Sequence, residues 1–179
     1  MNKNIVAVSI GDIDGIGIEI LINLWLKNKY KNFVLFTNDN IFKNYLKNKK
    51  LKIKTNTINN KKNFVFRKEE FNIFTFKANN KIENSIYSIN YSYENCKNNH
   101  FIGLITLPLR KDLIKNKINN FTGHTEYLQR LSKKSTSNMI FIYNKLLIST
   151  LTTHIKLKNI NKYLKKNNYF VDKIFSLNN

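Results

Sequence analysis

The sequence predicts an α/β fold in which a parallel sheet carries helices on its faces. Three apolar, strand-like runs occur early in the chain, at residues 5–9, 33–37 and 53–58. Helical segments lie between them, one reaching about Lys27 and a shorter one over residues 41–47. Two helices between three strands indicate βαβ units, whose strands run parallel in one sheet.

The first strand leads into a turn rich in glycine and aspartate, Gly11–Gly17. We predict that Asp12 or Asp14 caps the following helix. The spacing G-x-x-x-G-x-G matches neither the dinucleotide-binding fingerprint nor the P-loop, so the turn is weak evidence of phosphate binding. A tight turn between strand and helix explains the glycines at least as well.

Two helices are predicted to bury apolar stripes against the sheet, because their apolar residues recur at helical spacing. The first stripe consists of Ile16, Ile20 and Leu24, with Leu21 and Trp25 beside it. The second consists of Ile82, Ile86, Ile89 and Tyr93.

Aromatic strands are expected in the middle of the chain. Residues 64–66 and 72–76 read as a hairpin around Glu69 and Glu70, and core packing explains their aromatic rings better than base stacking. A strand over 101–106 then ends before Pro108, and a helix is expected over 111–117.

The last third of the chain is expected to hold a helix over 125–131 and an antiparallel hairpin. Its two strands, 139–143 and 146–151, are separated by only two residues. A helix starting near Asn159 and an amphipathic turn over 169–175 follow.

The charge of the chain is strongly positive: 31 Lys and Arg against 11 Asp and Glu give a net charge of +20. This balance suggests a polyanionic partner, and a small basic nucleic-acid-binding protein is one alternative function. Only Arg67, Arg110 and Arg130 are arginines, however, whereas modules that read bases rely on forked arginine contacts. A basic solvated surface is therefore favoured over a nucleic-acid interface.

A cytoplasmic location without a membrane span is expected. The single cysteine, Cys96, excludes an internal disulfide framework and fits a reducing compartment. The most apolar window, 16–26, is interrupted by Glu19 and Asn23 and is shorter than the roughly 20 residues of a span.

Two histidines lie at predicted element boundaries. His124 and Thr125 begin a helix, where an imidazole, a hydroxyl and free backbone N–H groups suit a phosphate or carboxylate. Simple capping by Thr122 or Gly123 is the alternative. His154 follows a strand and is a candidate metal ligand or acid/base, although a histidine there can also be only hydrogen-bonded.

Four motifs occur in order along the chain. They are G-D-x-x-G-I-G-x-E-I from Gly11, L-I-T-x-P-x-x-K from Leu104, F-T-G-H-T-E from Phe121 and T-T-H-I-x-L from Thr152. Together they resemble the 4-hydroxythreonine-4-phosphate dehydrogenase family, called PdxA, of pyridoxal phosphate biosynthesis. Ile13, Asp14 and Ile18 depart from the usual residues of the first motif.

The resemblance implies a three-layer α/β/α fold like that of isocitrate and isopropylmalate dehydrogenases. It implies a first lobe over 1–120 and the beginning of a second lobe over 121–179, because family members are about twice as long as this chain. The complete protein is expected to be a homodimer. A catalytically dead remnant lobe is the alternative that the length leaves open.

The resemblance also implies oxidation and decarboxylation of 4-phosphooxy-L-threonine, with NAD or NADP as cofactor. His124 and Thr125 are then expected to contact this small phosphorylated substrate. His154 is expected to be one of three histidine ligands of a divalent cation, which could be zinc, magnesium or cobalt. Asp12 and Lys111 are possible supporting residues. The other two metal histidines are expected in the half that these residues do not span.

Overall fold

The structure is a computed structural model that describes residues 4–59, 64–118, 121–134, 137–152 and 155–166, together with 171 and 174. The chain divides into two compact units, Met1–Thr122 and Gly123–Asn179. Each unit is described by itself.

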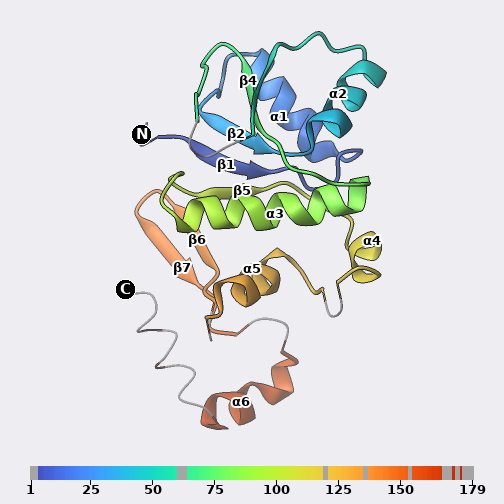
Figure 1. Cartoon of the computed structure of the whole chain (residues 1–179). Helices are drawn as coiled ribbons and strands as arrows, with labels where there is room; N and C mark the ends of the chain where they lie inside the picture. The colour runs from blue at the N-terminus through green and yellow to red at the C-terminus, as the bar shows by residue number, and fades with distance from the viewer. Residues whose placement is uncertain are drawn as a thin grey trace. The chain divides into compact units, whose positions relative to one another are not determined.

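The first unit is built on a five-stranded parallel sheet with the order β3-β4-β2-β1-β5 (Figure 1). Its strands are β1 (Val6–Ser9), β2 (Phe33–Phe36), β3 (Thr55–Ile58), β4 (Phe71–Phe74) and β5 (Leu104–Thr106). Every pairing in this sheet is parallel, so the predicted α/β class is confirmed.

Helices cover both faces of the sheet, which gives the unit three layers (Figure 1). Helices α1 (Ile16–Leu26) and α2 (Asp39–Asn48) enclose one apolar core, and α3 (Lys81–Lys97) packs on the other face. Aromatic rings fill much of the first core, where Phe71 contacts Phe33, Phe42 and Trp25. The short helix α4 (Lys111–Lys115) follows β5.

The buried face of α1 differs from the predicted one. Ile18, Leu21 and Ile22 pack into the core, whereas Ile16, Ile20 and Leu24 are exposed. Apart from Glu19 and Asn23, which are exposed, the helix consists of apolar residues and one glycine, so the spacing of the apolar residues alone did not identify the face that meets the sheet. The prediction of a buried Ile16–Ile20–Leu24 stripe was wrong, whereas Leu21 is buried as predicted and Trp25 packs partly buried against the core.

Helix α3 faces the sheet with small and polar side chains as well as isoleucines. Ile86 and Ile89 are buried as predicted, while Ile82 and Tyr93 are only half-buried. The serine hydroxyls on this face lie within hydrogen-bonding distance of backbone carbonyls of their own helix, and the Ser85 hydroxyl is closer still to the Gly11 carbonyl in the turn after β1. These serines are Ser85, Ser88 and Ser92. Their polar atoms are therefore satisfied without partners in the sheet.

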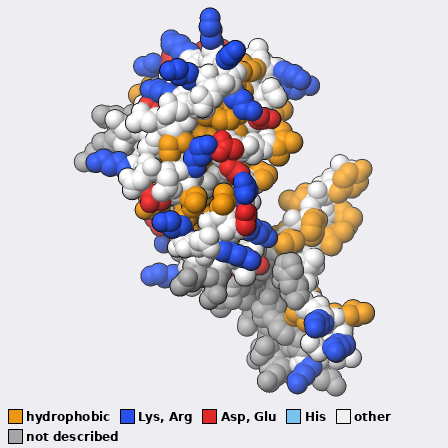
Figure 2. All heavy atoms as spheres, turned by 90° about the vertical axis from the view of Figure 1, so that its right-hand side faces the viewer, with side chains coloured by type: hydrophobic (Ala, Val, Ile, Leu, Met, Phe, Trp, Pro, Cys, Tyr) orange, Lys and Arg blue, Asp and Glu red, His pale blue; other side chains and the backbone are white. Residues whose placement is uncertain are grey.

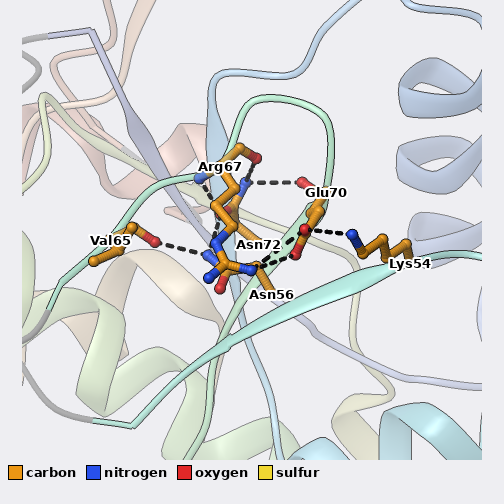
Figure 3. Close-up of polar contacts among 6 residues, drawn as sticks. All are labelled: Lys54, Asn56, Val65, Arg67, Glu70 and Asn72. Atoms are coloured by element: carbon orange, nitrogen blue, oxygen red, sulfur yellow. Dashed lines mark hydrogen bonds and ion pairs between the residues drawn. The ribbon is translucent and has the colours of Figure 1, made fainter.

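The predicted aromatic hairpin is wrong. Residues 64–67 form no strand, and β4 pairs in parallel with both β3 and β2. The segment before β4 is instead held by buried amides, as Figure 3 shows. The Asn72 side chain accepts from Asn56 and from the Arg67 N–H, and it donates to the Arg67 and Glu70 carbonyls. Such a network depends on tertiary pairing, which local pattern does not reveal.

The second unit contains α5 (His124–Ser132), β6 (Ile140–Tyr143), β7 (Leu146–Ser149), the short 3₁₀ helix η1 (Leu157–Asn159) and α6 (Ile160–Lys166). Strands β6 and β7 form the predicted antiparallel hairpin, with Ile142 opposite Leu147. Most of the predicted turn over 169–175 lies outside the described residues.

Basic side chains are spread over the surface seen in Figure 2, with acidic side chains among them. The same mixing appears in ion pairs such as Lys49–Glu19 and Lys31–Glu69. In the described part of the chain, no helix has the length and apolar character that crossing a bilayer requires.

Candidate active-site edge of the first unit

The carboxyl ends of β1 and β5 lie side by side, because the two strands are parallel neighbours. Strand β1 lies between β2 and β5 in the sheet. The chain passes from β1 to β2 through α1 on one face of the sheet, and it reaches β5 through α3 on the opposite face. Strands whose connections diverge in this way form a topological switch point. In open α/β sheets, ligands bind just outside the carboxyl ends of such strands.

The turn after β1 and the loop after β5 contact each other at this edge. The Asp12 N–H donates a 2.8 Å hydrogen bond to the Pro108 carbonyl. Gly11 has a φ of +61°, and a Cβ there would overlap the carbonyl oxygens of Leu107 and Pro108. Gly17 lies against the proline ring, where a Cβ would be 2.8 Å from Cδ. The first two sequence motifs, which are far apart in the sequence, therefore pack directly against each other.

The turn itself is closed by Asp12. Its carboxylate accepts a 3.0 Å hydrogen bond from the Asp14 N–H, and its carbonyl accepts one of 3.0 Å from the Gly15 N–H. Gly15 is the N-cap of α1 and provides no side chain. The predicted capping by Asp12 or Asp14 was wrong, because the Asp12 carboxylate is engaged within the turn.

A crevice of about 60 Å³ opens between the turn and the loop. Oppositely charged side chains line it, and the Lys81 ammonium lies 2.7 Å from the Asp14 carboxylate. Arg110 pairs with Asp112 at 3.1 Å, and this hydrogen bond raises the Arg110 pKa, with Asp12 and Asp14 adding to the effect. The lining residues are Asp12, Asp14, Lys81, Ile82, Ser85, Arg110, Leu113 and Ile114. Groups of both signs thus face one small opening, which suits a zwitterionic or phosphorylated ligand.

A larger hollow of about 230 Å³ adjoins the crevice, and Asp14 and Lys81 line both. Ile13 and Tyr45 supply apolar surface, while asparagine amides supply hydrogen-bonding groups. Burial raises the pKa of the Tyr45 hydroxyl, with nearby Glu19 adding to the effect. Tyr45 therefore remains a neutral hydroxyl near pH 7.

Two of the predicted site residues belong to this edge. Asp12 lines the crevice, whereas Lys111 begins α4, is exposed and is not among the lining residues. Sequence reasoning missed the roles of Arg110, Lys81 and Ser85. Arg110 lies within the second motif, so its place near the crevice could have been predicted from the sequence. Lys81 and Ser85 belong to no motif, and a lysine and a serine near the start of a helix do not indicate a binding site in so basic a chain.

The other predicted site residues belong to the second unit. Gly123 is the N-cap of α5, and its carbonyl accepts a hydrogen bond from the Tyr127 N–H. His124 is half-buried at the first position of the helix, and Thr125 is exposed beside it. Neighbouring Glu126 lies in the first turn, as the capping alternative requires. His154 and Thr153 lie outside the described residues.

A metal site is not complete within the described residues. Over those ranges no three His, Cys, Asp or Glu side chains lie close enough to hold a metal ion together. A closed site needs about four ligands, and a catalytic site needs about three from the protein. His154, the predicted metal ligand, lies outside the residues to which this statement applies.

Comparisons with known proteins agree with the motifs. The family described as "Pyridoxal phosphate biosynthetic protein PdxA" matches residues 29–177. The 4-hydroxythreonine-4-phosphate dehydrogenase of Wigglesworthia glossinidia brevipalpis is 30% identical over 93% of this chain and 54% of its own length. That of Pseudomonas putida is 33% identical over 67 residues, which are 37% of this chain and 20% of the relative.

Solved structures agree on the fold. The crystal structure of 4-hydroxythreonine-4-phosphate dehydrogenase from Klebsiella pneumoniae matches with a TM-score of 0.76 at 20% identity, over 92% of this chain and 54% of that one. The chain therefore spans about half the length of the proteins that it matches along its whole extent. Motifs, fold and family match agree that the chain belongs to the PdxA family, whose N-terminal half it resembles.

Proposed function

We propose that this chain supplies the N-terminal half of a 4-hydroxythreonine-4-phosphate dehydrogenase that serves pyridoxal phosphate biosynthesis. The observation that carries the proposal is the match to the PdxA family over most of the chain. The contact between Asp12 and Pro108 supports it, because this contact joins two of the family-like motifs at the sheet edge where ligands bind.

In the proposed reaction, the substrate hydroxyl loses its proton and the carbon that bears it passes a hydride to NAD or NADP. The resulting oxo acid then loses carbon dioxide. His124 and Thr125 are proposed to contact the phosphorylated substrate, because the N–H groups at the start of α5 favour an anion there.

Asp12 is proposed to keep the turn after β1 in the shape that opens the crevice. Lys111 and Arg110 would add positive charge at its mouth. We propose His154 as one ligand of a divalent cation, whose chemistry would be to polarise the substrate hydroxyl.

The test requires an assembly that spans the full length of the relatives. Residues 1–179 are joined to the part of the Wigglesworthia relative that follows its match, and 4-hydroxythreonine-4-phosphate, NAD or NADP, and a divalent cation are added. Formation of reduced nicotinamide is expected, and His154→Ala is expected to abolish it. His100→Ala is the matched control, because His100 belongs to none of the four motifs.

A folded assembly that binds cofactor but never turns over would instead support the dead-remnant alternative. That alternative also predicts that residues 1–179 bind zinc, magnesium or cobalt no more tightly than their His154→Ala variant does.

A further inference from the structure

A salt bridge between Asp14 and Lys81 lies where the small crevice and the larger hollow adjoin, because both residues line both spaces. The Lys81 ammonium is 2.7 and 3.0 Å from the two carboxylate oxygens of Asp14. The side chains of Lys81 and Asp14 are 60% and 59% exposed. Because an exposed ion pair contributes little to stability, a ligand can separate the two groups at small cost.

The backbone on each side of this salt bridge is held by other contacts. The Asp14 N–H donates to the Asp12 carboxylate within the turn after β1. The Asn80 side chain caps α3 by accepting from the Glu83 N–H, which fixes the start of that helix beside Lys81. A ligand therefore meets one carboxylate and one ammonium at defined positions, and only their side chains need to move.

The hollow has the chemical groups that a nucleoside requires. Ile13, Ile41 and Tyr45 supply apolar surface for the faces of a base. Side-chain amides, which both donate and accept hydrogen bonds, suit the edges of the base. These amides belong to Asn44, Asn48, Asn79 and Asn80. The Asp14 carboxylate suits sugar hydroxyls, which donate to it. With a volume of about 230 Å³, the hollow is smaller than the roughly 300–1,000 Å³ of pockets that enclose a whole ligand, so it fits one end of a longer molecule.

Each lysine that lines the hollow already has an acidic partner. Among the described lining residues, the charged ones are Asp14, Lys49 and Lys81. Lys49 lies 2.7 Å from the Glu19 carboxylate, as Lys81 lies 2.7 Å from that of Asp14. An additional phosphate group on a ligand therefore finds no unpaired lysine in this set, and it meets the negative charge of Asp14.

We propose that the hollow takes the adenosine end of the nicotinamide cofactor and that Asp14 makes this chain select NAD over NADP. The proposal rests on the proposed function, which leaves the choice between the two cofactors open. The Asp14 carboxylate accepts hydrogen bonds from the ribose hydroxyls of NAD, and its charge repels the 2′-phosphate that distinguishes NADP. Lys81 attracts that phosphate only when Asp14 does not neutralise it. Because Asp14 is a departure from the usual first motif, this selectivity belongs to the chain's own sequence.

The test measures binding and uses no turnover. Adenosine 5′-monophosphate and adenosine 2′,5′-bisphosphate represent the adenosine ends of NAD and NADP. Each is titrated by calorimetry into residues 1–179 and into the assembly in which these residues are joined to the C-terminal part of the Wigglesworthia relative. The monophosphate is expected to bind about tenfold more tightly than the bisphosphate. Amide NMR signals of Ile13, Asn44 and Asn79 are expected to shift on binding, because these residues line the hollow.

Variants separate the two members of the salt bridge. Asp14→Asn frees Lys81 and is expected to raise the affinity for the bisphosphate, relative to the monophosphate, about tenfold. Lys81→Gln, added to Asp14→Asn, is expected to remove that gain. Glu94→Gln is the matched control, since it removes the same charge at an exposed position of α3 that does not line the hollow. The wild-type preference stands as a test even if a variant fails to fold.

Three outcomes would overturn the proposal. If neither compound bound to either sample, the hollow would not be a nucleoside site. Equal or tighter binding of the bisphosphate by the wild type would show that Asp14 does not exclude the second phosphate. A preference that Asp14→Asn leaves unchanged would assign the selectivity to other residues.

Failure of the proposed function has a different signature. Selective binding of the monophosphate without turnover by the joined assembly would support the assignment of Asp14 and contradict the dehydrogenase activity. Turnover with a cofactor preference that does not respond to Asp14→Asn would do the reverse.

Discussion

The backbone N–H of Asp12 donates to the carbonyl oxygen of Pro108 at 2.8 Å, which ties the turn after β1 to the loop after β5. These residues are 96 positions apart in sequence, yet both follow strands that are neighbours in the sheet. The hydrogen bond requires close backbone approach at Gly11. The shape of the crevice therefore depends on Gly11, which has no side chain.

Gly11→Ala is expected to destabilise the first unit by at least about 2 kcal/mol. The new Cβ would overlap the carbonyls of Leu107 and Pro108 in a left-handed backbone conformation. Gly103→Ala is the matched control, because no atom lies within 4 Å of a Cβ there, and it should change stability by less than about 0.5 kcal/mol. Urea unfolding followed by circular dichroism measures both. Equal stability of the two variants would contradict the close approach at Gly11.

Asn72→Ala is expected to cost about 2–3 kcal/mol, because it would leave buried hydrogen-bonding groups of Asn56 and the Arg67 backbone without their partner (Figure 3). The control is Asn44→Ala, an exposed position in α2, where alanine should be neutral or slightly stabilising. Urea titrations compare the two variants. If Asn72→Ala lowered the free energy of unfolding no more than Asn44→Ala, the hydrogen bonds of Asn72 would add nothing to stability.

The order of most helices and strands could be predicted from the sequence, but their packing and strand pairing could not. Strand-like runs and helical spacing located β1, β2, α2 and the β6–β7 hairpin, because these are local signals. The buried face of α1 and the parallel pairing of β4 depend on which surfaces meet. A mostly apolar helix and a short aromatic run contain too little information for that decision.

The candidate site shows the same division. Asp12 and Pro108 were singled out because glycine, aspartate and proline punctuate a chain that is otherwise poor in such signals. Lys81 and Ser85 reach the crevice only because α3 begins beside the turn. Nothing in their local sequence distinguishes them from the many other lysines and serines.

Acid is expected to weaken the segment before β4 through Glu70. Hydrogen bonding from Lys54, with Arg67 adding to it, holds the pKa of Glu70 below its usual value of 4.5. Since the unfolded chain then binds the proton more tightly, this stabilisation is present above the unfolded pKa and is lost as the pH falls through the folded one.

The stability difference between wild type and Glu70→Gln should therefore be largest near pH 7 and should shrink between about pH 5 and pH 3. Urea unfolding at several pH values measures it, with Glu94→Gln, an exposed position on α3, as the control. A difference that stays constant with pH would exclude a role for the ionised carboxylate.

Cys96 is expected to react slowly with thiol reagents while the protein is folded. Burial raises the pKa of its thiol to about 11, so little thiolate is present at pH 8. Alkylation by iodoacetamide should then be roughly 100-fold slower than in urea-unfolded protein. Cys96 is the only cysteine in the chain, so the measured rate belongs to that residue alone. Equal rates in the folded and unfolded protein would place the thiol in solvent.

Nucleic-acid binding is expected to be weak and without sequence preference. The net charge of +20 attracts any polyanion, but basic side chains are interspersed with acidic ones on the face seen in Figure 2. Affinity for DNA, RNA and heparin should be similar and should fall steeply between about 50 and 200 mM salt, as counterion release predicts. Fluorescence anisotropy across this range measures it. Binding of one nucleic acid that exceeds heparin binding and persists at physiological salt would instead favour a dedicated nucleic-acid function, because phosphate attraction alone gives no such preference.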